Sequence, residues 1–263
     1  MEIKQLTSDS KNNKVSFLLS KSTPHFANAI RRIILEEVPT MAIEDVEFRE
    51  NSSILYDEII ALRLGLIPLT TDLKSYNLPA KCKCKGVGCA RCQLKMTLKS
   101  NNDIAYSSEI KSKDPKIKPV FLEIPIVKLL KGQKIELEAT ACLGQGKDHA
   151  KWTPGLVFYK YKPVIEIGKS VKDPEAVVKS CPVGVFELKG DKLLINDKRL
   201  FDCHLCQNCM NADKSINVIE SENDFIFYVE SWGQLSCKEM LVTASDILIE
   251  KLDELSIKLK EIK

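Results

Sequence analysis

The residues best suited to chemistry in this 263-residue chain are its ten cysteines, and three of them are spaced by two residues. The run is Cys203-x-x-Cys206-x-x-Cys209, and the dipeptide Cys181-Pro182 lies upstream of it. Short loops of this kind aim each sulfur at a different iron, so three thiolates can wrap one corner of an iron–sulfur cube. The pattern therefore predicts one iron–sulfur cluster, with Cys181 as the fourth ligand.

The position that follows this run departs from a familiar pattern. A bacterial-type ferredoxin carries a further cysteine and a proline after the third cysteine, whereas this chain has Asp213 there. Four cysteines predict a 4Fe-4S cluster, and a 3Fe-4S cluster follows if Cys181 is not a ligand. Because segment 169–222 has little apolar sequence, we expect a ferredoxin-like insertion stabilised by its cluster. Reduced buried cysteines, or a zinc site that uses His204, are the alternatives.

A second cysteine group brings four thiols together within one short loop. Its members are spaced as Cys82-x-Cys84-x4-Cys89-x2-Cys92. Four thiolates suit tetrahedral zinc, and local disulfides of the kind that hyperthermophiles keep are the alternative. Basic residues that would offset the thiolate charge are Lys81, Lys83, Lys85 and Arg91. The two isolated cysteines, Cys142 and Cys237, are expected to be buried as small hydrophobes.

The elements near the N-terminus are predicted from capping and periodicity. A strand is expected over Lys14–Leu19, and a helix over Thr23–Glu37 with Thr23 as its cap. The apolar face of this helix consists of Phe26, Ala27, Ile30, Ile33 and Ile34. Arg31 and Arg32 are adjacent and lie outside that apolar face. Periodicity alone indicates a solvated basic surface there.

The C-terminal region predicts a strand over Asp224–Trp232 and then a long helix. Ser236 and Glu239 have the spacing of a capping box at its start. Its apolar seam consists of Leu241, Ala244, Leu248, Leu252, Leu255, Leu259 and Ile262. Such a seam is more often a domain core, but no further chain follows to cover it, so we expect a partner helix.

A sequence signature that resembles that of a known family starts in the first predicted helix. The matching stretches are Ala27–Leu35, Val38–Ile43, Asp57–Glu58 and Leu64–Leu69. They resemble the assembly signature of the alpha-like subunits of DNA-directed RNA polymerases, and the archaeal members are the most similar. Leu62 stands where that signature usually carries a histidine. The resemblance implies a non-catalytic subunit that dimerises and holds the large catalytic subunits together.

The resemblance also implies a fold and partners. The expected class is α+β, with a split dimerisation domain of sheet and long helices made of residues 1–43 and 223–263. A mostly β insertion (44–168) would carry the cysteine loop, which eukaryotic relatives have and many archaeal ones lack, and the ferredoxin-like insertion would be 169–222. The implied partners are a small alpha-like subunit L, small subunits N and P, and the second-largest polymerase subunit. The implied interface residues are Phe26, Ile30, Arg31, Arg32, Ile33, Leu248 and Leu252.

Composition and the remaining motifs exclude several other functions. The net charge is only +3, from 39 basic and 36 acidic residues, so nothing drives the whole chain toward nucleic acid. No apolar run approaches a membrane span or a signal peptide, and we expect a cytoplasmic protein. The segment Gly144–Pro154 lacks the glycine spacing of a phosphate loop, and a structural or interface role is favoured for His149. No Asp-x-Asp run exists to hold a polymerase magnesium.

Two other functions stay open at this point. A ferredoxin-like electron carrier would explain the cluster, and it predicts that the isolated cluster domain folds and cycles at low potential. A nucleic-acid-binding zinc or iron–sulfur protein would explain the local lysines, and it predicts salt-sensitive DNA affinity.

Overall fold

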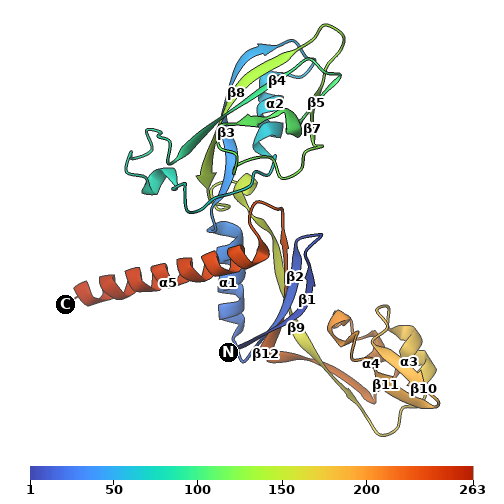
Figure 1. Ribbon diagram of the computed structural model, residues 1–263. Coiled ribbons are helices and arrows are strands. Elements are labelled where there is room, and N and C mark those ends of the chain that lie inside the picture. The colour runs from blue at the N-terminus through green and yellow to red at the C-terminus, as the bar shows by residue number, and fades with distance from the viewer. Residues whose placement is uncertain (263) are drawn as a thin grey trace. The chain divides into compact units, whose positions relative to one another are not determined.

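The structure is a computed structural model that describes residues 1–262, and it combines antiparallel sheets with a few helices (Figure 1). The predicted α+β class is therefore confirmed. Residues 1–8, 15–28 and 158–228 form one compact unit. A second unit consists of residues 9–14, 29–157 and the chain from Val229 onward. The division into three domains made from the sequence stays a prediction.

The first unit is built on a four-stranded sheet in the order β1-β2-β12-β9. Its strands are β1 (Glu2–Asp9), β2 (Lys14–Ser20), β9 (Gly155–Ile167) and β12 (Ile216–Ser231). Aromatic side chains of neighbouring strands pack against one another. Phe17 on β2 stacks on Phe227 on β12, with the ring centroids 5.1 Å apart. Tyr159 meets Phe225 edge to face at 5.6 Å. The predicted strands at both ends of the chain are thus confirmed as neighbours in one sheet.

A small insert lies between β9 and β12 in the sequence. Its elements are α3 (Pro174–Ser180), β10 (Phe186–Lys189), β11 (Lys192–Ile195) and α4 (Asn208–Ala212). The two strands form an antiparallel hairpin in which Phe186 faces Ile195. The insert has its own small core, which includes Val177, Phe186 and Leu193 together with Cys203 and Cys209. Two of the predicted iron ligands are therefore part of the packing of this insert.

The helix α1 (Pro24–Glu36) begins where the sequence predicts. Thr23 caps it, because its side-chain oxygen accepts a hydrogen bond from the Phe26 N–H at 3.3 Å. Ala27 and Ile34 are fully buried, and Ile30 and Ile33 are nearly so. The predicted apolar face is thus covered within the chain itself over most of its length.

The second unit holds an extensive hydrophobic core. Its main sheet has the order β3-β8-β4-β6, and a smaller sheet pairs β5 with β7. These strands are β3 (Thr40–Asn51), β4 (Gln93–Ser100), β5 (Ile104–Tyr106), β6 (Lys111–Ser112), β7 (Pro125–Lys128) and β8 (Ile135–Gly144). The helix α2 (Asp57–Gly65) buries Ile60 and Leu64 in a core with Met41, Met96 and Leu137. The mostly β character predicted for this region is confirmed.

The segment after β8 completes the C-terminal end of α1. This helix has no basic residue in its last turn, and its final carbonyl groups need donors from elsewhere. The Lys147 N–H donates to the Glu36 carbonyl at 3.0 Å, and the Gln145 side chain donates to the Glu37 carbonyl at 2.7 Å. A Cβ atom on Gly146 would collide with the Leu35 carbonyl oxygen. The segment that could be mistaken for a phosphate loop therefore caps the chain's own helix.

The last helix, α5 (Cys237–Glu261), starts with the predicted capping box. The Ser236 hydroxyl accepts from the Glu239 N–H at 3.2 Å, and the Glu239 carboxylate accepts from the Ser236 N–H at 2.9 Å. Cys237, Met240 and Ala244 are the buried residues of this helix. The isolated cysteines Cys142 and Cys237 are both buried, as predicted. Among residues 1–262, no helix is both long enough and apolar enough to cross a membrane.

Candidate functional site

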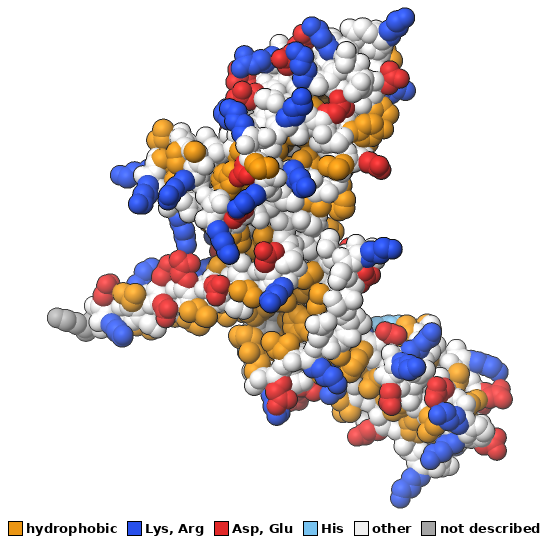
Figure 2. Space-filling view, viewed as in Figure 1, with side chains coloured by type: hydrophobic (Ala, Val, Ile, Leu, Met, Phe, Trp, Pro, Cys, Tyr) orange, Lys and Arg blue, Asp and Glu red, His pale blue; other side chains and the backbone are white. Residues whose placement is uncertain are grey.

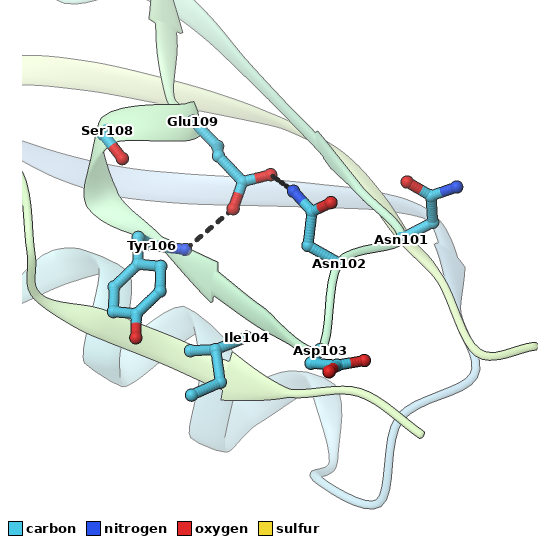
Figure 3. A pocket seen from close by; sticks show the side chains of 7 residues that line it. All are labelled: Asn101, Asn102, Asp103, Ile104, Tyr106, Ser108 and Glu109. Atoms are coloured by element: carbon cyan, nitrogen blue, oxygen red, sulfur yellow. Dashed lines mark hydrogen bonds between the residues drawn. The ribbon is translucent and has the colours of Figure 1, made fainter. Parts of the chain in front are cut away.

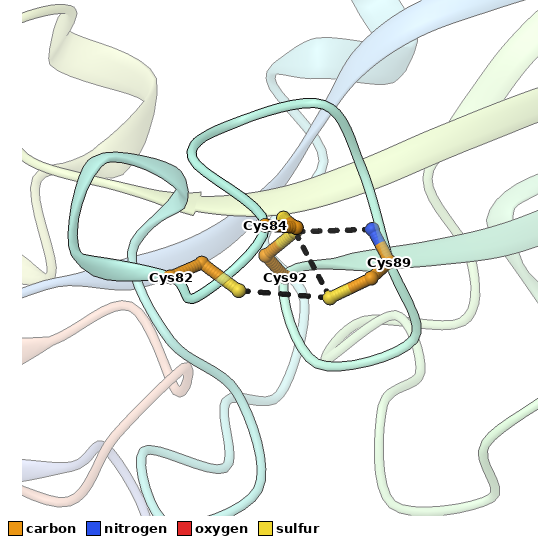
Figure 4. Close-up of side chains that lie close together, drawn as sticks. All are labelled: Cys82, Cys84, Cys89 and Cys92. Carbon is orange, nitrogen blue, oxygen red and sulfur yellow. Dashed lines mark hydrogen bonds between the residues drawn. The ribbon is translucent and has the colours of Figure 1, made fainter.

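The four cysteines of the loop after α2 converge on one point (Figure 4). The sulfur–sulfur distances are 3.6 Å from Cys82 to Cys89, 3.5 Å from Cys84 to Cys92 and 3.8 Å from Cys89 to Cys92. Zinc–sulfur bonds of about 2.3 Å in a tetrahedron separate the sulfurs by roughly 3.8 Å, whereas a disulfide holds them near 2.05 Å. The four thiols lie close enough together to bind one metal ion, which is what the cysteine spacing predicts.

The loop backbone creates this arrangement through turns that favour glycine. Gly86 and Gly88 have φ values of +84° and +102°, which L side chains rarely adopt. The Gly88 N–H points at Cys84 and is the main cause that lowers the pKa of the Cys84 thiol to about 6. Burial raises the pKa of Cys92 to about 12. A metal bound here would have to displace a proton from Cys92, so its affinity would rise with pH.

The second cysteine group is assembled from two distant parts of the insert. Cys181, Cys203, Cys206 and Cys209 line one small pocket, whose other walls include Val185, Phe186 and Val218. Cys203 and Cys209 are buried, Cys181 is half-buried and Cys206 is exposed. The structure therefore places all four sequence-predicted ligands around one pocket.

The conformation of the Cys203–Cys209 run suits sulfur ligation. Leu205 and Gln207, the residues on either side of Cys206, adopt left-handed φ values of +59° and +63°. The Val185 N–H donates to the Cys181 sulfur at 3.3 Å. Hydrogen bonds to cysteine sulfur are one way in which proteins stabilise and tune iron–sulfur clusters. The donor set fits a cluster with cysteine ligands.

Asp213 occupies the place at which a ferredoxin would carry its further cysteine, and its role is structural. Its carboxylate accepts hydrogen bonds from the Lys172 N–H at 2.7 Å and from the Ser215 N–H at 2.8 Å. These bonds join the start of the insert to its end. The N–H and hydroxyl of Ser215 are the main causes that lower the pKa of Asp213 to about 2.

The α1 residues predicted at an interface differ in exposure. Phe26 and Arg31 are half-buried and Arg32 is exposed, whereas Ile30 and Ile33 are buried within the chain. Arg32 forms a bidentate pair with Glu36 one turn later. Its Nε and Nη2 donate to the two carboxylate oxygens at 3.2 and 3.0 Å. A partner that met this helix would therefore contact its polar side more than its apolar face.

The seam on α5 is largely uncovered. Leu241 and Leu248 are half-buried, but Leu252, Leu255 and Leu259 are each more than half exposed. Figure 2 shows apolar side chains along this helix, interspersed with charged ones. Exposed apolar surface of this extent on one element marks an interaction site in most proteins.

An ion-pair network that sequence reasoning missed connects α5 to the end of α1. The Glu37 carboxylate accepts from Lys251 at 2.6 Å and from Lys147 at 3.2 Å. Burial acts to raise the pKa of Glu37, but the hydrogen bonds from the two lysines outweigh it, and the pKa is lowered. Lys81, next to the cysteine loop, pairs with Glu250 at 3.0 Å. These charges lie around a groove of about 450 Å³, and nothing in their sequence positions indicates the pairing.

Another hollow, formed by the turn around residues 101–109, has no comparable chemistry (Figure 3). The Glu109 carboxylate in it accepts hydrogen bonds from the Asn102 side chain at 2.9 Å and from the Tyr106 N–H at 3.0 Å. These bonds stabilise the turn itself.

Comparison with known proteins identifies the class to which this fold and these surfaces belong. Residues 16–252 match the family described as the RNA polymerase Rpb3/Rpb11 dimerisation domain. The chain belongs to this family, and the predicted membership of the alpha-like polymerase subunits is confirmed.

Individual relatives agree with this family. The chain is 42% identical to the DNA-directed RNA polymerase subunit Rpo3 of Methanosphaera stadtmanae over 88% of each chain. It is 40% identical to the Rpo3 subunit of Methanosarcina mazei over 91% of each. It is 37% identical to that of Pyrococcus furiosus over 97% of this chain and 96% of the relative. The expectation of a non-catalytic subunit in a DNA-directed RNA polymerase is confirmed by these relatives.

Proposed function

We propose that this chain is an assembly platform of DNA-directed RNA polymerase and that it pairs through α5 with the small alpha-like subunit L. The observation that carries the proposal is the exposed seam of Leu252, Leu255 and Leu259 on a helix of a dimerisation-domain family. Pairing would remove these side chains from water, and each fully buried leucine contributes about 2 kcal/mol. The resulting heterodimer would act in the cytoplasm, joined by small subunits N and P.

We also propose that the polar side of α1 binds the second-largest polymerase subunit. Arg32 is exposed and already oriented by Glu36, so it can meet a carboxylate with little loss of side-chain freedom. Arg31 stands beside it on the same helix. Replacing both with Ala should leave the heterodimer intact and block its entry into the larger enzyme.

For the cysteine loop, zinc is the metal that the donors support best. Three of the sulfur–sulfur distances are 3.5–3.8 Å and all lie within 4.8 Å, which supports a closed tetrahedral site of the kind typical of structural zinc. The bound thiolates would carry net negative charge, and Lys81, Lys83, Lys85 and Arg91 surround the loop in sequence. The metal would hold a loop that has few apolar side chains of its own.

For Cys181, Cys203, Cys206 and Cys209, we favour one structural 4Fe-4S cluster. The support is that the four thiols line one pocket and that two of them belong to the core of the insert. When bound, the cluster would supply four iron–sulfur bonds that tie residue 181 to the run 203–209. A 3Fe-4S cluster would result if Cys181 were not a ligand.

The test is to co-express the chain with the small alpha-like subunit and the second-largest subunit, and to analyse the purified complexes. We expect a heterodimer that contains zinc, and iron and sulfide in equal amounts. The Arg31→Ala/Arg32→Ala variant should form the heterodimer but fail to bind the large subunit, while Arg49→Ala, an exposed control, should bind it. A chain that stays monomeric and cycles electrons through its cluster would instead support a ferredoxin-like carrier.

A further inference from the structure

We infer that Lys160 is a positioning residue of the iron–sulfur site: it fixes the ligand run to the sheet and supplies positive charge beside the cluster. The inference rests on the proposed cluster at Cys181, Cys203, Cys206 and Cys209. Lys160 lies on β9, more than forty residues before the first cysteine of the run. Its sequence position gives no sign of this role.

The contact is direct. The Lys160 ammonium donates a hydrogen bond to the Cys203 carbonyl at 3.0 Å. It lies over the ring of Tyr228 on β12, 5.6 Å from the ring centroid. The Tyr228 hydroxyl in turn donates to the Phe201 carbonyl at 3.4 Å. Side chains from two sheet strands therefore hold the backbone just before and at the first ligand of the run.

The neighbouring lysine on the same strand shows that this arrangement is particular to Lys160. Lys162 is two residues further along β9 and pairs with the carboxylate of Asp224 at 3.1 Å. Lys160 instead bonds the neutral carbonyl oxygen of Cys203 and, within residues 1–262, forms no ion pair of this kind with a carboxylate. Its charge is thus directed at the ligand run.

Charge of this sign has a use at that place. A cluster with four thiolate ligands is negatively charged, and the pocket walls contributed by Val183, Val185 and Phe186 are apolar. An ammonium at the edge of such a site attracts the cluster, because charges interact more strongly beside apolar walls than in bulk water. It also favours the reduced state, since reduction adds one more negative charge.

The experiment uses the full chain in its heterodimer and compares Lys160→Met, Lys160→Gln and Lys160→Arg with Lys162→Met. Iron release to a chelator and the midpoint potential are measured for each. We expect Lys160→Met to release iron at least about threefold faster than the wild type. Its potential should fall by about 59 mV, a tenfold shift of a one-electron equilibrium.

The other variants separate the anchor from the charge. Lys160→Gln keeps a hydrogen-bond donor without the charge and should show the lower potential even if Lys160→Met folds poorly. Lys160→Arg should restore both properties, and Lys162→Met should match the wild type. A wild-type chain without iron and sulfide would overturn the proposed cluster itself. A normal cluster whose potential is unchanged in Lys160→Met and Lys160→Gln would overturn the role of Lys160 alone.

Discussion

The helices α1 and α5 differ in how much of their surface the chain covers by itself. On α1 the apolar residues Ala27 and Ile34 are fully buried, and the last carbonyls accept hydrogen bonds from residues 145–147. On α5 only the first turns are buried, and Leu252, Leu255 and Leu259 are exposed. One helix is completed within the chain, whereas the other presents an apolar seam that the described residues leave exposed.

This difference suggests separate roles for the two helices in an assembly subunit: α1 would stabilise the fold, and α5 would bind a partner. A helix such as α1, whose apolar face is buried within the chain, would provide a rigid base. A helix such as α5, whose apolar side chains are exposed, would contribute binding free energy when a partner covers them. The ion pairs of Glu37 join the two, because this residue follows α1 and binds Lys251 of α5.

The largest effect is expected for Leu252→Glu combined with Leu255→Glu. Burying two carboxylates in an apolar interface is costly, and affinity for the small alpha-like subunit should fall by at least about a hundredfold. Co-purification and calorimetry would measure the loss. Ile257→Glu is a matched control, because Ile257 is equally exposed but lies about 200° around the helix from Leu255. Equal loss in both variants would mean that the seam has no special role.

A smaller effect, about 2 kcal/mol of unfolding free energy, is expected for Gly146→Ala. The added methyl group would meet the Leu35 carbonyl oxygen, which is backbone and cannot swing aside. Thermal or denaturant unfolding would detect the change. Gly65→Ala should be nearly neutral, since its Cβ would make ordinary van der Waals contacts with the Ile43 carbonyl oxygen and the Lys151 side chain. A Gly146→Ala chain as stable as the wild type would contradict the account of how α1 ends.

The joint between the helices should depend on pH. The pKa of Glu37 is lowered in the folded chain, so its contribution is fully present above the unfolded value of about 4.3 and is lost as the pH falls below it. We expect Glu37→Gln to cost about 1 kcal/mol at pH 7 and much less at pH 3. Unfolding of both chains at the two pH values checks this. A cost that does not change with pH would exclude a role for the carboxylate charge.

Removal of the loop metal should have the smallest effect on pairing. A chelator should make residues 82–92 sensitive to protease, because the loop loses the bonds that close it. The Lys81–Glu250 pair is exposed, and such pairs contribute less than about 1 kcal/mol. Affinity for the small subunit should therefore change by about twofold or less. A complete loss of pairing on chelation would show that the loop controls the seam.

Local signals predicted much of this structure. The Thr23 cap and the Ser236–Glu239 box need only residues three positions apart, and both are present. Cysteine spacing also indicated the close group of four thiols in the loop, and the four cysteines of the insert line one pocket. In these cases the physical constraint is contained in a short stretch of chain or in a rare residue type.

Long-range pairing of common residues was not predictable. Glu37 and Lys251 are 214 positions apart, and the chain has so many lysines and acids that no pattern selects this pair. Lys160 likewise gave no signal of its contact with Cys203. The α1 face illustrates another limit, since helical periodicity identifies Ile30 and Ile33 as apolar but cannot tell a core from an interface. Those two residues are buried within the chain.

Hydrogen exchange of the chain alone and in complex with the small alpha-like subunit would show whether the α5 seam is the pairing surface. The exposed seam predicts that the α5 amides from Ile249 to Glu261 exchange quickly in the chain alone and slow by at least about tenfold in the complex. The amides of the first α1 turns should change less, because their apolar face is already covered. Unchanged exchange over Ile249–Glu261 in a complex that has formed would contradict the account.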